Sequence, residues 1–455
     1  SLHKNIERES RKDVSMESKK YKISILGAGL VGSLLSIMLA KRGYQVTIFE
    51  RRPDMRKAGA IGGRSINLAL SRRGLKALER IGLKDKIQES CIPMPGRMIH
   101  DLAGNLDFQP YGKEGEYINS VSRGGLNWLL MNQAEAHGVN IQFEHRCIDV
   151  DFDSATASFD NGTSISADFL FGGDGAFSAL RGAMQKTDRF NFTQQYISAG
   201  YKELTMPPTA DGDFAIDPGA LHIWPRGEYM LIALPNLDKS FTCTLFFPFE
   251  GEISFDSIRT EADAEAFFND KFKDAVPHLP NLKKEFFENP TSSLITVRCD
   301  PWVKGNTALI GDSAHAIVPF YGQGMNSGFE DCYVFDQLLE KHGDINDALL
   351  AEYQELRIPD GNAIADLALY NFIEMRDKVA DDKFLLQKKI EKKLNELYPE
   401  KWVPLYSMVT FSDYRYSEAI AKGDKQQVIM NEVLARQGIE ENWENLDLEE
   451  VVNKL

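Results

Sequence analysis

The chain lacks long apolar runs, clustered cysteines and an excess of positive charge. None of its apolar runs reaches the about 18 to 20 residues that a membrane-spanning helix requires. Its 5 cysteines stand far apart and include no C-x-x-C pair, which disfavours a disulfide framework or a thiolate zinc site. We therefore expect a cytoplasmic protein with no membrane anchor and no metal site.

Negative charge predominates over positive charge. The 455 residues include 67 Asp and Glu against 52 Lys and Arg, which gives a formal net charge of −15. Such a chain repels phosphate backbones, so we expect no nucleic-acid partner, and any anionic ligand must be held by a local basic residue. The length suits two or three domains, and the sequence leaves open a monomer or a homodimer. Residues 1–20 are polar, and we expect a disordered arm or a cloning remnant there.

A dinucleotide-binding pattern opens the ordered part of the chain. The predicted strand at residues 21–26 leads into G-x-G-x-x-G, formed by Gly27, Gly29 and Gly32, and then into a helix and a second strand that ends at Glu50. The first glycine permits a tight turn, the second lets backbone approach a pyrophosphate, and the third lets helix and strand pack closely. Glu50 then suits a ribose hydroxyl. The alternative is a βαβ turn without a ligand.

Two arginines follow this acid directly. Arg51 and Arg52 have the charge to contact a 2′-phosphate of a nicotinamide cofactor. The alternatives are a solvated pair or a guanidinium stacked on adenine. We favour these alternatives, because Glu50 would repel the phosphate.

Two later segments narrow the class of cofactor. Residues 174–181 read D-G-A-F-S-A-L-R, and residues 311–326 read G-D-S-A-H-A-I-V-P-F-Y-G-Q-G-M-N. Together with the glycine pattern, they resemble the single-component FAD-dependent aromatic hydroxylases, which carry these three motifs in this order. The implied fold is α/β: a Rossmann-like FAD-binding domain with an inserted antiparallel β-sheet substrate domain and a C-terminal helical region.

The resemblance also implies which residues hold FAD. Asp312 would bond a ribityl hydroxyl, although it could instead cap a helix. The helix that begins near Gly324 would direct backbone N–H groups at the flavin ring and favour its anionic reduced form. The expected cofactor-binding residues are Gly27, Gly29, Val31, Gly32, Phe49, Glu50, Arg51, Arg52, Ala69, Arg123, Cys147, Asp174, Asp312, Pro319, Gly324, Met325 and Asn326.

Seven further stretches resemble one branch of these hydroxylases, the kynurenine 3-monooxygenases. They are residues 63–71, 97–100, 110–112, 117–123, 357–360, 370–376 and 404–411. This resemblance implies that L-kynurenine is hydroxylated to 3-hydroxykynurenine through a flavin C4a-hydroperoxide, with FAD bound, NADPH as transient reductant and O₂ as co-substrate. No acid–base pair stands out, so the catalytic residues remain unknown. The alternatives are a flavin hydroxylase of another aromatic acid and a non-catalytic FAD-binding sensor.

The same resemblance implies the substrate contacts. They fall on Arg97, Tyr111, Asn371 and Tyr406, with Phe320 as an apolar wall for the aniline ring. A planar guanidinium suits an amino-acid carboxylate because it binds both oxygens at once. Taken alone, these residues also fit a surface charge, core-edge aromatics, a helix-surface amide and a core phenylalanine.

The predicted domains are interleaved along the chain. The FAD-binding domain takes residues 21–95, 112–190 and 295–345, and the β-rich substrate domain takes 96–111 and 191–294. The helical region takes 346–455, with helices at 347–356, 361–379 and 383–397 separated by weak breaks. Strands are expected at 195–204, 221–225, 229–235 and 241–248, as antiparallel hairpins.

Overall fold

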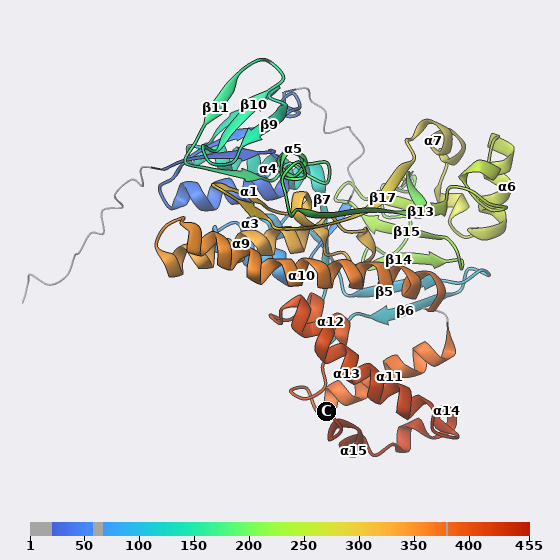
Figure 1. Ribbon diagram of the computed structural model, residues 1–455. Coiled ribbons are helices and arrows are strands. Elements are labelled where there is room, and N and C mark those ends of the chain that lie inside the picture. Colours follow the sequence, from blue (N-terminus) through green and yellow to red (C-terminus); the bar gives the residue numbers. More distant parts are fainter. Residues whose placement is uncertain (1–20, 58–66, 379–380) are drawn as a thin grey trace, which may run out of the picture.

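The computed structural model describes residues 21–57, 67–378 and 381–455 (Figure 1). The predicted arm at residues 1–20 and the start of the resembling stretch at 63–71 lie outside these described residues. Figure 1 shows two sheets side by side, with a long helix running along both and a group of helices beneath it.

The first sheet has six strands in the order β18-β19-β12-β1-β2-β8. All neighbours pair in parallel except β18 and β19. Its central strands are almost fully buried, as expected for a parallel sheet covered by helices on both faces. The bounds are β1 Lys22–Leu26, β2 Gln45–Phe49, β8 Asn140–Gln142, β12 Phe169–Gly172, β18 Val303–Lys304 and β19 Thr307–Leu309. This arrangement confirms the Rossmann-like α/β fold.

Helices and two small sheets surround this six-stranded sheet. The helices are α1 Leu30–Lys41, α2 Arg72–Arg80, α3 Lys84–Gln88, α4 Arg123–Ala136, α5 Ala179–Met184, α8 Asp312–His315 and α9 Gly324–His342. The small sheets contain β3 Asn67–Leu70, β4 Ile92–Met94 and β7 Ile118–Ser122, and β9 Cys147–Asp151, β10 Thr156–Phe159 and β11 Ser164–Ser166. Because α1 packs on both α4 and α9, one apolar core joins segments from distant parts of the chain.

The second sheet has seven strands in the order β17-β13-β16-β15-β14-β5-β6. The bounds are β5 Gly96–His100, β6 Leu106–Pro110, β13 Asn191–Met206, β14 Ala220–Pro225, β15 Met230–Pro235, β16 Phe241–Pro248 and β17 Ser292–Asp300. The predicted hairpins are antiparallel, but β14 and β5 pair in parallel. The domain boundary predicted after residue 294 falls inside β17, so the division into domains stays a prediction. Helices α6 Glu261–Lys271 and α7 Leu282–Glu288 share one core with this sheet.

The C-terminal part is helical, as expected. Its helices are α10 Asp347–Ile373, α11 Asp382–Leu397, α12 Leu405–Thr410, α13 Tyr416–Leu434, α14 Ile439–Asn442 and α15 Leu448–Val452, with a π-helical turn at Glu374–Lys378. The weak break predicted between residues 356 and 361 is wrong, because α10 continues through this segment, Pro359 included. Arg357 and Asp360, on either side of the proline, are buried and held by ion pairs with Asp331 and Arg415, which keep this turn helical. Among the described residues, no helix is both long and apolar enough to span a membrane.

Candidate active site

The glycine pattern forms an open cradle at the carboxyl end of β1. Gly27 has a φ of +98°, and a Cβ there would lie 2.3 Å from the Gly173 carbonyl oxygen. A Cβ on Gly32 would lie 2.1 Å from the Gly27 carbonyl oxygen, so both positions exclude side chains by contact. Gly29 is exposed, and a Cβ there would meet no atom within 4 Å. The space above Gly29, at the N-terminus of α1, is therefore free to receive a ligand's phosphates.

Glu50 closes one side of this cradle. Its Oε2 accepts a hydrogen bond from the Ala28 N–H at 2.8 Å, and its Oε1 accepts one from the Arg52 N–H at 3.1 Å. The side chains of Arg51 and Arg52 are exposed. Phe49 is buried, with its ring 4.8 Å from the Phe159 ring, so its side chain belongs to the core.

The loop that carries Asp312 is fixed from below by buried charges. Gly311 has a φ of +69°, and its N–H donates to Asp331 Oδ2 at 3.0 Å. His315 bonds the same carboxylate oxygen, and Arg357 Nε donates to the other at 2.7 Å. These contacts give His315 a structural role, since they place it beneath the loop.

Asp312 itself points away from this network. Its side chain is exposed although the residues on either side of it are buried. Enough protein nevertheless surrounds it that desolvation raises the pKa of its carboxyl, against the opposing effects of Arg123 and His315. An acid in such a recess is suited to accept hydrogen bonds from a bound ligand. We find no capping hydrogen bond from this carboxylate among the hydrogen bonds of the described residues.

The start of α9 is tied to β3 by Asn326. Its Nδ2 donates to the Ala69 carbonyl at 2.7 Å and to the Gly322 carbonyl at 2.9 Å, and its Oδ1 accepts from the Ser71 N–H at 2.9 Å. The first turn of a helix leaves its N–H groups without carbonyl partners. The Asn326 side chain thus fixes an anion-favouring helix end beside β3. Of the other predicted residues here, Met325 is buried, Gly324 is half-buried and Pro319 is exposed.

Val31 brings the three motifs together. A Cβ on Gly311 would lie 3.1 Å from the Val31 side chain, and one on Gly328 of α9 would lie 2.6 Å from it. The glycine cradle, the Asp312 loop and α9 therefore meet at one place. The open space over Gly29 and the exposed acid in the recess fit a dinucleotide that runs from Glu50 toward α9.

Three other predicted cofactor residues have local partners. Asp174 accepts hydrogen bonds from the Ser178 hydroxyl at 2.5 Å and from the Ala179 N–H at 2.8 Å, so it caps α5. Cys147 bonds the Asp149 carbonyl, and burial raises the pKa of its thiol to about 12. Arg123 is exposed at the start of α4. A contact between any of them and the cofactor stays a prediction.

The predicted substrate residues Arg97, Tyr111 and Tyr406 form a cluster. The guanidinium carbon of Arg97 lies 5.5 Å from the Tyr111 ring centroid and 5.3 Å from that of Tyr406. The two rings stack on each other at 5.2 Å, with 12° between their planes. Tyr321, which the sequence did not predict, stacks on Tyr406 at 5.4 Å. Strand β5, the segment after β6 and helix α12 supply the three predicted residues.

Arg97 has no ion-pair partner in the part of the chain that the structure describes. Its Nε and the Tyr111 hydroxyl are both buried and make no hydrogen bond of normal geometry there. Burial alone would lower the pKa of Arg97, but the neighbouring Tyr111, Tyr406 and Glu374 raise it, so the guanidinium stays charged. A charge held this way is stabilised by an anion that reaches it.

Asn371 and Phe320 lie together on the apolar side of this cluster. Asn371 Nδ2 donates to the Phe320 carbonyl at 2.5 Å, so the amide group is already engaged by the protein. The Phe320 ring lies 4.8 Å from the Phe246 ring and 4.3 Å from the Phe372 ring. The wall and core interpretations of Phe320 both remain, and the Asn371 contact stays a prediction.

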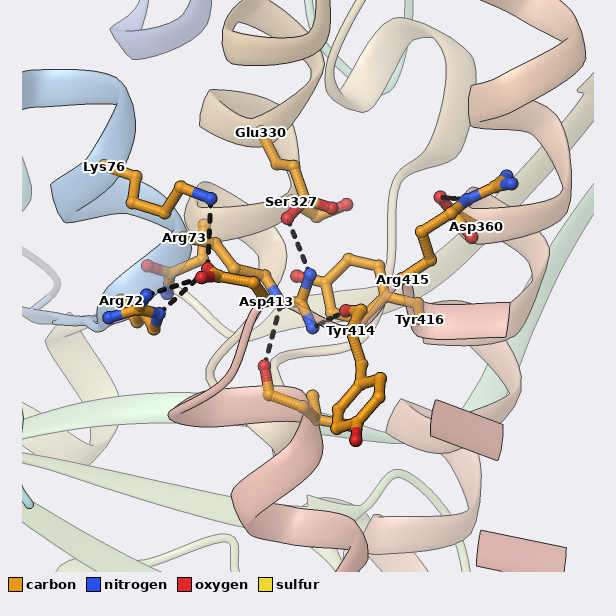
Figure 2. Close-up of polar contacts among 12 residues, drawn as sticks. Arg72, Arg73, Lys76, Ser327, Glu330, Asp360, Asp413, Tyr414, Arg415 and Tyr416 are labelled. Carbon is orange, nitrogen blue, oxygen red and sulfur yellow. Dashed lines mark hydrogen bonds and ion pairs between the residues drawn. The ribbon is translucent and has the colours of Figure 1, made fainter. Parts of the chain in front are cut away.

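Sequence reasoning missed Arg73, which joins the cofactor side to α12 (Figure 2). It is buried on α2, and its Nε donates to the Val409 carbonyl of α12 at 2.8 Å. Its Nη1 bonds Glu330 of α9 at 2.6 Å, and its guanidinium lies 4.1 Å from the centre of the Tyr416 ring. No local pattern distinguishes a buried arginine from an exposed one on an amphipathic helix, so only the tertiary structure reveals it.

Comparison with solved structures agrees with this fold. A 2-methyl-3-hydroxypyridine-5-carboxylic acid oxygenase superimposes with a TM-score of 0.67 at 20% identity, over 83% of this chain and 98% of that one. A tetracycline destructase superimposes with a TM-score of 0.62 at 17% identity, over 88% and 99%. At these identities the likeness shows the fold alone.

Sequence comparison identifies the family. A family model described as an FAD binding domain matches residues 20–368. A kynurenine 3-monooxygenase of Christiangramia forsetii is 49% identical over 443 residues, which cover 96% of this chain and 99% of the relative. One of Sus scrofa is 44% identical over 92% of this chain and 90% of its own length. With the cradle, the recessed acid and the arginine cluster on one scaffold, this chain belongs to the kynurenine 3-monooxygenase family of FAD-dependent enzymes.

Proposed function

We propose that this enzyme hydroxylates L-kynurenine at the ring carbon beside the amino group, giving 3-hydroxykynurenine, at the expense of NADPH and O₂. The observation that carries the proposal is Arg97, a half-buried cation that forms no ion pair among the described residues and lies beside two stacked tyrosines. The relatives' name supplies the identity of the substrate.

Arg97 would hold the substrate carboxylate. A guanidinium offers paired N–H donors to both carboxylate oxygens, and the Tyr111 hydroxyl, which interacts with Arg97 and Tyr406, adds a neutral donor. Burial raises the pKa of Tyr111 and Tyr406, so both hydroxyls stay protonated and able to donate. The cluster thus offers several donors and a positive charge in a chain of net charge −15.

The cofactor would lie along the open cradle. Glu50 would accept from the adenosine ribose, the space above Gly29 would take the pyrophosphate, and Asp312 would accept from a ribityl hydroxyl. The first turn of α9 would direct its N–H groups at the pyrimidine edge of the flavin, where they stabilise negative charge. When bound, FAD supplies the redox chemistry that couples NADPH and O₂ to ring hydroxylation.

The surrounding apolar side chains would keep water away from the reacting ring. Phe320 packs on both Phe246 and Phe372, and the three belong to an apolar cluster that joins the seven-stranded sheet to α10 and α12. A dry wall of this kind orients an aromatic substrate and strengthens the polar contacts at its other end. The residues that tie α12 to α2 and α9, above all Arg73, would hold Tyr406 in place.

We keep the interleaved domain division and a cytoplasmic location as part of this proposal. The 5 free cysteines support a reducing compartment. The choice between a monomer and a homodimer stays open.

The test is NADPH oxidation by the purified, FAD-loaded protein with and without L-kynurenine, with the product analysed by mass. We expect stimulation and a product one oxygen atom heavier. L-tryptophan, which has the same amino-acid group on a different ring system, serves as the control. Stimulation without the oxygenated product would make kynurenine an effector of an oxidase. FAD binding with no stimulation would keep the scaffold and reject the substrate.

A further inference from the structure

A chain of buried hydrogen bonds lies on the seven-stranded sheet beside β5. His100 Nδ1 lies 2.5 Å from Asp274 Oδ2, and His100 Nε2 lies 2.7 Å from His222 Nδ1. His222 Nε2 lies 2.7 Å from the Asp217 carbonyl oxygen. The two imidazoles are 3% and 1% exposed. Trp224 stacks on His100 and donates from Nε1 to Asp274 Oδ1 at 3.0 Å, so each carboxylate oxygen has its own partner.

Three hydrogen bonds in a row require three protons. The chain ends on two acceptors, the Asp274 carboxylate and the Asp217 carbonyl, so His100 Nδ1 and His222 Nε2 must each carry a proton. The contact between the two rings needs a third. Two neutral imidazoles carry only two protons between them. The geometry therefore demands one extra proton, and without it two acceptors would face each other at hydrogen-bond distance.

The geometry assigns this proton to His100, because His100 is the ring that bonds the Asp274 carboxylate directly. Burial lowers the pKa of His222 to about 4, so His222 is neutral. Burial alone would raise the pKa of Asp274, but the bonds from His100 and Trp224 outweigh it and hold the pKa below its usual value, so Asp274 is ionised. The pair is thus a His100 imidazolium bonded to the Asp274 carboxylate, with no net charge.

One further charged side chain packs against this pair. Arg226 donates from Nη1 to the His100 carbonyl at 2.9 Å and from Nε to the Lys271 carbonyl at 2.6 Å, and its Nη2 reaches the Asp101 carbonyl. Lys271 contacts Arg226 through its backbone carbonyl, and the Asp101 carboxylate also favours the charge of Arg226. Arg226 disfavours a further positive charge nearby, while the carboxylates of Asp274 and Asp217 favour one.

The same strand carries Arg97. In the parallel pairing, Arg97 stands opposite Leu221, and His222 stands opposite Met98. Because side chains alternate along a strand, Arg97 points to one face of the sheet and His100 to the other. β5 lies one strand from the edge of the sheet, between β14 and the edge strand β6. The bonds from His100 to His222 and Asp274 therefore add anchors on its second face, about 10 Å along the strand from Arg97.

We propose that His100, His222 and Asp274 are positioning residues that hold one shared proton and thereby fix β5, and with it Arg97, for substrate binding. The proposal rests on the role of Arg97 in the proposed function. Loss of the proton on raising the pH leaves either His222 Nε2 or the ring–ring contact without a hydrogen, and the strand end loses its anchor. Substrate affinity should then fall while the cofactor stays bound.

The chain offers a matched variant that removes the need for the proton. In Asp274→Asn, the amide oxygen still accepts from Trp224, and the amide nitrogen donates to His100 Nδ1. His100 Nε2 then donates to His222, and His222 Nε2 donates to the Asp217 carbonyl, with both rings neutral. Every hydrogen bond is kept without the extra proton. Asp274→Ala removes the anchor outright and serves as the second variant.

The experiment measures KM for L-kynurenine and kcat of the FAD-loaded enzymes from neutral to alkaline pH. Relative to Asp274→Asn, the wild type should show a KM that rises about fivefold or more as the proton is lost, with kcat changed far less. Titration of the substrate's amino group is common to both enzymes and cancels in the ratio. Asp274→Ala should have the raised KM at every pH, and the exposed-site variant His137→Gln should follow the wild type. Parallel KM profiles for the wild type and Asp274→Asn would overturn the proposal.

Nitrogen NMR of ¹⁵N-histidine-labelled protein shows which ring nitrogens carry a proton, independently of activity. We expect His100 to show both ring nitrogens protonated at neutral pH in the wild type and only one in Asp274→Asn, with His100→Gln used to assign the signals. A neutral His100 in the wild type would overturn the proposal even if KM varied with pH. If the wild type does not act on L-kynurenine at all, the proposed function fails, and the resonances still report whether the proton is held.

Discussion

Replacing Arg97 with methionine should separate substrate binding from stability. Arg97 forms no ion pair among the described residues, and its charged group is in contact mainly with the Tyr111 and Tyr406 rings. Methionine has a similar length and no charge, so Arg97→Met removes the carboxylate partner while filling the same space. Loss of one member of a desolvated charge pair costs about 2–5 kcal/mol of binding. This corresponds to a loss of affinity of about 30-fold to several thousand-fold.

The stability of the substrate-free enzyme should respond differently. Arg97→Met loses two cation–π contacts, worth about 0.5–2 kcal/mol each. It also removes the desolvation of a cation that forms no ion pair among the described residues, which is unfavourable by a comparable or larger amount. We therefore expect the free energy of unfolding to fall by no more than about 1 kcal/mol, or to rise. Arg226→Met is the contrast, because it leaves the carbonyls of His100 and Lys271 without their donor and should lower stability clearly.

Both quantities are measurable on FAD-loaded protein. Titration of L-kynurenine against the visible spectrum of the flavin gives the dissociation constant, and thermal or urea unfolding gives the stability. An unchanged dissociation constant in Arg97→Met would refute the carboxylate role of Arg97. A large loss of stability with affinity intact would show instead that Arg97 is a structural residue of the β5 strand.

Four other substitutions test the proposed cofactor-binding residues and the residues around Arg97. Gly29→Val should abolish FAD binding without unfolding the protein, because its side chain enters open space where the pyrophosphate is proposed to lie; retained yellow colour after purification would contradict this. Asp312→Asn should weaken FAD binding and stabilise the FAD-free protein near neutral pH. Burial raises the pKa of the Asp312 carboxyl, so its ionised form opposes folding once the pH exceeds its pKa in the unfolded chain, about 4. Urea titrations at acidic and neutral pH show whether the stability difference between variant and wild type changes with pH in this direction. Arg73→Met should raise KM for L-kynurenine and lower stability by about 1–3 kcal/mol, because it leaves the Val409 carbonyl of α12 without its donor and leaves Glu330 with Arg357 as its remaining ion-pair partner among the described residues. A change in FAD affinity alone would contradict the link to Tyr406. Tyr406→Phe should cost about 1.5–3 kcal/mol in kcat/KM, and unchanged kinetics would remove its hydroxyl from the substrate contacts.

Motifs whose function is local to the chain were predictable from the sequence. The strand, glycine turn, helix and acid at residues 21–50 follow from hydrophobic spacing and from where glycine alone fits, and the structure has β1, α1 and β2 there. The hairpin strands at 221–225 and 241–248 were likewise found to within one residue at each end. Each of these elements depends on contacts between residues close in the chain, and the spacing of apolar residues indicates such contacts.

Features that depend on contacts between distant segments could not be predicted from the sequence. A proline inside α10 looks like a break, yet Arg357 bonds Asp331 from another helix and the turn stays helical. The parallel pairing of β5 with β14 joins segments more than a hundred residues apart and places His100 against His222, which neither segment reveals alone. The substrate contact of Asn371 stays a prediction, and the sequence does not show that its amide nitrogen donates to the Phe320 carbonyl, a contact across 51 residues.

The difference between the residues that the sequence predicted and those that it did not follows from the chemistry of the site. Arg97 and Asp312 resemble each other in one respect: each places an ionisable group in a protein recess where few of the described groups neutralise its charge. Residues of this kind gain their partners from ligands, so the motifs that bind ligands identify them in the sequence. The groups that hold them in place, such as Asp331 under the Asp312 loop and His100 at the end of β5, have their hydrogen-bond partners within the protein. It follows that substitutions in the first group should impair binding with little loss of stability, and substitutions in the second should impair both.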